Sequence, residues 1–314
     1  MSRIHEALKK AEQERAAIAT AETDAPSFQT ESATAATVAP TGNKEMPVQG
    51  GDILSRTVLT SPGSGEYLRF DDLRARCAHP AWHLDPNVNV FVNSDSSAQG
   101  SEQFRTLRSR LYQMRSNQPL RTLLVTSSIP TEGKTFVTNN LAQAIVRQPD
   151  RRALIIDADL RRSRLHVPLG APSSPGLTDY LRGTVDMVSI IQQGQEGNLC
   201  FIPGGDEVTN PSELIANGRM KVLLDRLAPI FDWIILDSPP CLLVADASIL
   251  ADLCDGVLLV TRAGVTPAAT AQRACQELRG RNVVGVVLNA MQNSHKYHSD
   301  YYYYGYGESK EPNN

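Results

Sequence analysis

The sequence predicts an α/β domain with a mostly parallel sheet and helices on both of its faces. Helix-like stretches separate most of a series of short apolar runs. These runs lie at residues 123–126, 153–157, 199–203, 233–237, 256–261 and 283–289. Strands that are almost continuously apolar are buried on both faces, and alternation with helices is typical of parallel sheets with right-handed crossovers.

The N-terminal part of the chain lies outside this pattern. Residues 1–17 predict a short amphipathic helix, because their apolar residues recur at helical spacing. The thin, Ala-rich stripe favours a solvated helix, with a docking helix for a partner protein as the alternative. Residues 18–51 are rich in Ala, Thr, Ser, Pro and Glu and predict a disordered linker. Residues 52–86 are mixed in character and predict a partly ordered lead-in.

The predicted α/β domain spans residues 87–292. It begins with a short strand or extended segment at residues 87–93, and a helix follows over residues 101–114. Three charged residues of this helix are spaced to share one broad face: Glu102, Arg105 and Arg108. Charged residues three apart on a helix can pair locally, and such a face is most often only solvated.

The first apolar run leads into Ser128-Ile-Pro-Thr-Glu-Gly-Lys-Thr135, and a helix is predicted over residues 136–146. A strand, a loop and a helix that starts with Gly-Lys-Thr form the arrangement of a phosphate-binding loop, although Ser128 replaces the first glycine of the usual pattern. Backbone N–H groups and the helix dipole favour a bound anion there. The residues expected to contact the nucleotide are Ser128, Thr131, Glu132, Gly133, Lys134, Thr135 and Phe136.

Two further strands end in aspartates. Asp157 and Asp159 follow the second apolar run, and Asp237 ends the fourth. The carboxyl ends of parallel strands lie on one edge of the sheet, where ligands bind. A single aspartate there is usually a turn or cap residue. Beside Gly-Lys-Thr, however, these aspartates predict phosphoryl transfer, which needs a lysine, a metal and carboxylates around the γ-phosphate.

Each of these side chains has an expected role. Lys134 is expected to reach the β- and γ-phosphates. We expect Thr135, Asp157 and Asp237 to bind Mg²⁺. Lys134, Asp157 and Asp159 are the predicted catalytic residues. One of the two neighbouring aspartates is expected to orient or deprotonate an attacking hydroxyl, and the sequence leaves open which of them does so.

The C-terminal part completes the pattern and then leaves it. Further helices are predicted at residues 212–228, 245–253 and 267–279. Residues 293–314 hold six of the nine tyrosines of the chain and no aliphatic residue. They predict a flexible tail rather than a packed element.

Composition excludes several classes of protein. The net charge is −3 and no basic block is present, which argues against nucleic acid as the main partner. The five cysteines are scattered without a C-x-x-C pair, so neither a zinc site nor a disulfide framework is indicated. The N-terminus is polar, which is unlike a signal peptide, and the longest apolar runs are too short to span a bilayer. We therefore expect a cytoplasmic protein.

From about residue 90 the chain resembles the bacterial tyrosine kinases (BY-kinases), which regulate capsular and exopolysaccharide synthesis. Residues 128–135 match the Walker A motif of that family, residues 154–159 its additional Walker A′ motif, and residues 234–240 its Walker B motif. The other matching pieces are Glu102, Arg105 and Arg108 as an E-x-x-R-x-x-R oligomerisation motif, residues 203–205 with 210–214, and the tyrosine cluster.

The resemblance implies ATP-dependent autophosphorylation with Mg²⁺, ring-like homo-oligomers and control of a polysaccharide polymerase and export system. The implied acceptors are Tyr297, Tyr301, Tyr302, Tyr303, Tyr304 and Tyr306. It also implies Asp157 as the group that orients the tyrosine hydroxyl. Because no membrane segment is fused to the kinase here, it implies a separate membrane-anchored activator of the polysaccharide co-polymerase type. A tyrosine phosphatase and a location at the inner face of the plasma membrane, through a partner, follow from the same resemblance.

Two alternatives share the predicted fold. A partitioning ATPase of the ParA/MinD type would also bind Mg·ATP, but that group carries a second lysine early in the loop. Here Ile129 stands at that position, followed by Pro130 and Thr131 where glycines are expected. Such an ATPase also has no reason to carry a tyrosine tail. The second alternative is a nucleotide-binding scaffold without kinase activity, and the intact lysine, threonine and aspartates argue against it.

Overall fold

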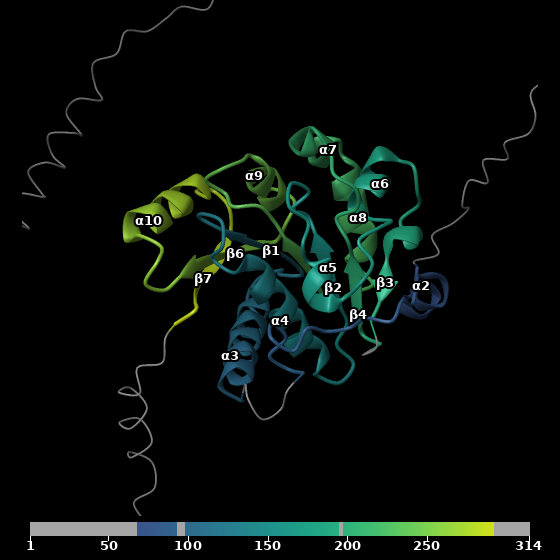
Figure 1. Ribbon diagram of the computed structural model, residues 1–314, viewed down its shortest axis with the longest axis horizontal. Helices are drawn as coiled ribbons and strands as arrows, with labels where there is room; N and C mark the ends of the chain where they lie inside the picture. Colours follow the sequence, from purple (N-terminus) through teal and green to yellow (C-terminus); the bar gives the residue numbers. More distant parts are fainter. Residues whose placement is uncertain (1–67, 93–97, 195–196, 292–314) are drawn as a thin grey trace, which may run out of the picture. The chain divides into compact units, whose positions relative to one another are not determined.

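The computed structural model describes residues 68–92, 98–194 and 197–291. Its strands are β1 (Thr122–Ser127), β2 (Ala153–Asp157), β3 (Gln192–Gln193), β4 (Leu199–Ile202), β5 (Trp233–Asp237), β6 (Gly256–Arg262) and β7 (Val283–Asn289). They form one seven-stranded sheet within these residues, in the order β3-β4-β2-β5-β1-β6-β7 (Figure 1). All of its pairings are parallel except that of β3 with β4. The mostly parallel sheet expected from the sequence is confirmed.

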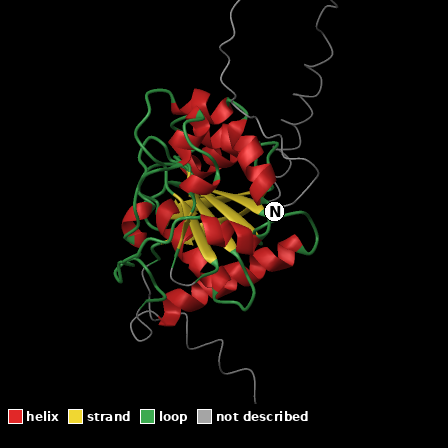
Figure 2. Ribbon diagram, turned by 90° about the vertical axis from the view of Figure 1, so that its right-hand side faces the viewer, coloured by secondary structure: helices red, strands yellow, loops and turns green. Residues whose placement is uncertain are grey.

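Helices cover both faces of this sheet (Figure 2). They are α2 (Phe70–Arg76), α3 (Ala98–Arg115), α4 (Lys134–Val146), α5 (His166–Leu169), α6 (Leu177–Arg182), α7 (Pro211–Ala216), α8 (Arg219–Leu227), α9 (Asp246–Ala251) and α10 (Ala268–Glu277), with a 3₁₀ turn at Val188–Ile190. The helices expected near residues 101–114, 136–146, 245–253 and 267–279 are all present.

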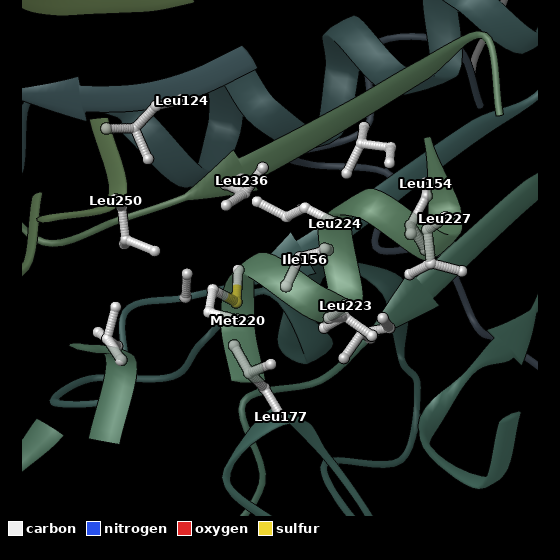
Figure 3. Close-up of a cluster of buried hydrophobic side chains, with 14 of the residues drawn as sticks. Leu124, Leu154, Ile156, Leu177, Met220, Leu223, Leu224, Leu227, Leu236 and Leu250 are labelled. Atoms are coloured by element: carbon white, nitrogen blue, oxygen red, sulfur yellow. The ribbon is translucent and has the colours of Figure 1, made fainter. Parts of the chain in front are cut away.

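Two apolar cores lie on opposite faces of the sheet. Alternate residues of each strand point to opposite faces, so Leu123 packs with α3, α4 and α5, whereas Leu124 packs with α8 and α9. Figure 3 shows the second core, where Leu223 of α8 lies near Ile156 of β2 and Leu227 of α8 lies near Leu154. Burial on both faces explains why the strands are apolar throughout.

The segment before residue 87 contributes to these cores. Leu73 of α2 is fully buried, and the ring of Phe70 lies edge-on to that of Phe231 at 5.7 Å. Trp82 packs in the same edge-on manner against Phe201 at 6.1 Å. The described part of the expected lead-in is therefore part of the folded domain. Residues 1–67 and 292–314 lie outside the described residues, and with them the predicted N-terminal helix, the linker and the tyrosine tail.

The prediction of a short strand or extended segment at residues 87–93 is wrong for its described part, because residues 86–88 and 90–92 form turns. The cause is Asn89, whose buried side-chain amide donates to the carbonyl oxygens of Asp85 and Pro168, both at 2.7 Å. Its carbonyl oxygen accepts from Asn139 and Gln143 of α4. Asparagine side chains that bond to nearby backbone favour turns over a strand ladder.

The single helix expected over residues 212–228 is also wrong. It is divided into α7 and α8 at Gly218, which has a φ of +84°. A left-handed residue cannot continue a right-handed helix, and glycine adopts this conformation without steric cost. The short elements β3, α5 and α6 have too few residues to show a clear hydrophobic period.

All five cysteines are free, and three of them are buried. Among the described helices, none combines the length and the apolar character needed to cross a bilayer.

We expect Asn89→Ala to destabilise the fold. The substitution leaves the Asn139 amide without a hydrogen-bond partner among the described residues, while the Gln143 amide and the two carbonyl oxygens each lose one of their hydrogen bonds. Each buried polar group left unpaired costs about 1–3 kcal/mol, so we expect a loss of about 3 kcal/mol in the free energy of unfolding. Urea denaturation measures this.

Asn87→Ala is the matched control, because the Asn87 side chain is exposed and, among the described residues, forms its hydrogen bond with Asp85. Its effect should stay below about 0.5 kcal/mol. Equal losses for the two variants would show that the Asn89 network is not what stabilises this segment.

Candidate active site

The phosphate-binding loop joins β1 to α4 at the carboxyl edge of the sheet. Gly133 is the N-cap of α4, with a φ of +97°. Its left-handed conformation favours glycine, and a Cβ on this residue would lie 2.0 Å from the side-chain nitrogen of Asn289 on β7 and displace that side chain. The first N–H groups of α4 have no carbonyl partners within the helix and are available to an anion.

Glu132 holds this loop in shape from inside. Its side chain is only 1% exposed, and one carboxylate oxygen accepts from the Ile129 N–H at 2.8 Å. The Thr266 hydroxyl donates to the other oxygen, and Asn289 donates to the Glu132 carbonyl at 2.9 Å. Glu132 was expected to contact the nucleotide, but its carboxylate faces the protein and braces the loop.

The other loop residues differ in the direction they face. The hydroxyl of Ser128 is buried and has no hydrogen-bond partner among the described residues. Thr131 is exposed and has a φ of +65°, which is rare for a residue other than glycine. Phe136 is partly buried, and its ring packs against that of Phe104 on α3, with ring centroids 5.7 Å apart.

Two of the predicted aspartates are direct neighbours. Asp157 of β2 and Asp237 of β5 are partners in the parallel register, and both side chains are buried. The Thr135 hydroxyl donates to Asp237 Oδ2 at 2.5 Å. The Ser163 hydroxyl and the Leu165 N–H donate to Asp157 Oδ2 at 2.8 and 2.9 Å. One oxygen of each carboxylate is therefore held by the protein.

The second oxygen of each carboxylate, Oδ1, is buried without a hydrogen-bond partner among the described residues. Burial raises the pKa of both Asp157 and Asp237, and repulsion between the two carboxylates raises the pKa of Asp237 further. Buried unpaired oxygens are costly, and hard carboxylate and hydroxyl oxygens are the ligands that Mg²⁺ prefers. With Thr135 beside them, these residues fit a Mg²⁺ ion.

Lys134 and Asp159 complete the cluster. Lys134 is 8% exposed at the start of α4, and its charge lowers the pKa of Asp237. Burial raises the pKa of Asp159, and the charge of Lys134 opposes this shift. Asp159 is only half-buried, and its Oδ1 accepts from the Arg162 N–H at 3.1 Å. The structure thus brings together the lysine, the threonine and the three aspartates that the sequence singled out.

Ser163 and Asn289 were not expected in the site. Asn289 carried a detectable signal, because it is a polar residue that ends an apolar strand, as Asp157 and Asp237 do. Ser163 carried none, because it is an isolated serine in a loop and its contact with Asp157 exists only in the fold.

The predicted charged face on α3 is only partly a free surface. Glu102 and Arg105 form an exposed ion pair at 3.0 Å. Arg108 instead donates to the carbonyl oxygen of Ala144 on α4 at 2.6 Å, and so helps to fasten α3 to the domain. The six tail tyrosines lie outside the described residues.

Comparison with known proteins identifies relatives of the chain, although no protein-family model matches it. Tyrosine-protein kinase YwqD of Bacillus subtilis is 33% identical over 219 residues, which cover 69% of this chain and 91% of YwqD. Tyrosine-protein kinase Etk of Escherichia coli K12 is 34% identical over 211 residues, but these cover only 29% of Etk. The solved kinase domain of E. coli ETK matches with a TM-score of 0.62 at 35% identity, over 71% of this chain and 86% of that domain. The chain belongs to the bacterial tyrosine kinases.

Proposed function

We propose that this kinase is an ATP- and Mg²⁺-dependent autokinase that phosphorylates tyrosines of its own tail. The observation that carries the proposal is the pair of buried, in-register aspartates, each with one free oxygen, beside Lys134 at the start of α4. Membership of the tyrosine kinases favours this activity over that of a ParA/MinD-type ATPase or an inactive scaffold.

The site offers what phosphoryl transfer requires of a protein, which is mainly positioning and charge stabilisation. The loop amides and Lys134 bind the phosphates of ATP. Thr135, Asp157 and Asp237 hold the Mg²⁺ ion, which when bound neutralises charge on those phosphates. The hydrogen bond from the Ile129 N–H to the inward-facing carboxylate of Glu132 keeps the loop in its binding conformation before nucleotide binds.

Transfer itself requires a positioned tyrosine. The bond between the γ-phosphorus and the bridging oxygen breaks, a bond from the phosphorus to the tyrosine oxygen forms, and the hydroxyl proton must leave. Asp157 and Asp159 supply the carboxylate that orients the hydroxyl and takes this proton. The resemblance to the family favours Asp157 for this role, while Asp159 is the more exposed of the two.

The tail can reach a site of this kind. β7 ends at Asn289 on the same edge of the sheet as the loop, 15 residues before Tyr304. A fully extended segment of that length spans at most about 50 Å, and a flexible coil about 20 Å. The site of the same subunit and that of a neighbour are both within reach, and we propose transfer within a homo-oligomer.

We propose a separate membrane-anchored activator of the polysaccharide co-polymerase type, which holds the kinase at the inner face of the plasma membrane. A tyrosine phosphatase reverses the modification, and the cycle controls synthesis and export of an exopolysaccharide or capsule. Each phosphotyrosine adds about −1.5 to −2 charges at pH 7, so a phosphorylated tail should loosen the oligomer by repulsion.

Phosphotyrosine on the purified protein tests the proposed activity. After incubation with Mg·ATP we expect an anti-phosphotyrosine signal that mass spectrometry places in residues 293–314. A variant with all six tail tyrosines changed to Phe should lose most of this signal. An active parent whose tail carries no phosphate would contradict the tail as the acceptor.

We expect Lys134→Met to abolish autophosphorylation while the fold persists. The substitution keeps a side chain of similar length but removes the cation that stabilises the transferred phosphoryl group. Loss of such a contact costs about 3–4 kcal/mol in the barrier, roughly a hundred- to a thousandfold in rate. Initial rates of phosphotyrosine formation measure this.

Lys221→Met is the matched control, because Lys221 forms an exposed ion pair with Asp225 on α8. It should retain the parent rate. A parent-like rate for Lys134→Met would refute the assignment of the loop.

Asp237→Asn and Asp157→Asn should each reduce the rate and weaken the dependence on Mg²⁺, because an amide is a poorer ligand than a carboxylate. Metal charge stabilisation contributes several kcal/mol, so we expect losses of at least about a hundredfold. Titration of activity with Mg²⁺ provides the measurement, with Asp225→Asn as the exposed control. Unchanged Mg²⁺ dependence in Asp237→Asn would remove this residue from the metal site.

Arg105→Ala should shift the protein from oligomer to monomer without loss of nucleotide binding. Arg105 is the exposed arginine of the predicted motif, whereas Arg108→Ala also loosens the packing of α3 on α4. Light scattering on the unphosphorylated protein measures the mass, with Arg110→Ala, on the same helix, as the control. If the mass of Arg105→Ala equals that of the parent, this face is merely solvated.

A further inference from the structure

Arg161 and Asp246 form a bidentate ion pair at the carboxyl edge of the sheet, beside the active site. Arg161 donates through Nε to Asp246 Oδ2 at 2.7 Å and through Nη2 to Asp246 Oδ1 at 3.1 Å. The Asp246 side chain is 0% exposed and that of Arg161 39%. A bidentate hydrogen-bonded pair between a guanidinium and a buried carboxylate has a specific geometry, unlike a surface ion pair.

Ser212 joins the pair. Arg161 Nη2 also donates to the Ser212 hydroxyl oxygen at 3.1 Å, and that hydroxyl donates to Asp246 Oδ1. Arg161 lies in the turn after β2, Ser212 lies in the first turn of α7, and Asp246 is the first residue of α9. We call this trio the edge clamp, because it ties three separate segments together where the sheet carries its catalytic groups.

Both partners of the clamp are charged. Burial alone would raise the pKa of Asp246, but hydrogen bonds from Arg161 and Ser212 outweigh burial and lower it. The same hydrogen bond to Asp246 raises the pKa of Arg161. The pair is therefore ionic, and a substitution of Arg161 alone leaves the Asp246 carboxylate as an unpaired buried charge.

The clamp acts on the turn that carries the predicted catalytic carboxylates. Asp159 opens this turn, since its backbone carbonyl accepts from the Arg162 N–H at 3.0 Å and its side chain accepts from the same N–H. Arg161 lies inside the turn, two residues after Asp159 and four after Asp157. The charge of Asp246 also reaches Asp159, whose pKa it raises.

We propose that Arg161 is a positioning residue for tyrosine phosphorylation, which through Asp246 and Ser212 fixes the Asp157–Asp159 turn against α7 and α9. The inference rests on the proposed kinase function and adds to it a residue outside the phosphate and metal contacts. Placement of reacting groups to within about 1 Å changes rates by about a hundredfold, so a clamp on this turn serves catalysis directly.

The competing explanation is that the pair only stabilises the fold. The two explanations differ in a double variant. Arg161→Met with Asp246→Asn removes both charges, so no unpaired buried charge remains and the fold should be about as stable as the parent. The same variant loses any positioning of the turn by Arg161, because both hydrogen bonds between Arg161 and Asp246 are removed.

The experiment compares this double variant with the parent and with a matched control. Arg281→Met is the control, because Arg281 makes an equally two-pronged pair with Asp252 just beyond the other end of α9. Each protein is tested for its melting temperature, its affinity for a fluorescent ADP analogue, its rate of autophosphorylation at saturating Mg·ATP and the hydrogen exchange of residues 158–165. Arg161→Lys keeps the positive charge but cannot form the bidentate hydrogen bonds of a guanidinium. It serves as a second variant if the double variant folds poorly.

We expect the double variant to melt near the parent, to bind nucleotide like the parent, and to phosphorylate about ten- to a hundredfold more slowly. The Arg162 and Leu165 amides, which bond to Asp159 and Asp157, should exchange faster in it. Arg281→Met should match the parent in rate and in the exchange of this segment. Arg161→Lys should lie between the parent and the double variant.

The proposal is overturned if the double variant keeps the parent rate, or if Arg281→Met slows the reaction equally. Parent-like exchange at residues 158–165 also overturns it, whatever the rate. A parent without kinase activity would refute the proposed function instead, and the exchange measurement would still decide whether the clamp holds the turn.

Discussion

The pairing of β2 with β5 is the constraint on which the rest of the site depends. It places Asp157 directly beside Asp237, with both carboxylates out of contact with water. A shift of one residue in this register would turn one of them into an apolar core, so the apolar residues on both faces of these strands also determine where the acids lie. The chemistry of the site is thus set by sheet packing.

Two buried acids in contact are unfavourable, and the surrounding structure is arranged to accommodate them. Thr135 and Ser163 each hold one carboxylate oxygen, while Lys134 supplies a nearby positive charge. The remaining oxygen of each carboxylate is buried and has no hydrogen-bond partner among the described residues. Strain of this kind is typical of functional sites, because a divalent cation relieves it and is bound in doing so.

Much of the fold could be predicted because its strands are buried on both faces. The bounds of β2, β5 and β7 follow directly from their apolar runs. The segment around Asn89 could not, because its turns depend on side-chain bonds to α4 and to Pro168, which lies 79 residues away. Gly218 could have signalled the break between α7 and α8, but an isolated glycine within an amphipathic pattern is often tolerated.

The candidate site likewise contains some residues that could be predicted from the sequence and others that could not. Lys134 and Asp237 are visible in the sequence because each follows or ends an apolar strand, and that position alone brings them to one edge. The direction of Glu132, by contrast, depends on Thr266, which is remote in the chain. Asp246 is the most instructive case, since an acid in the first turn of a helix already has a local explanation in the helix dipole. That explanation conceals its bond to Arg161, 85 residues earlier, which only the folded chain brings within reach.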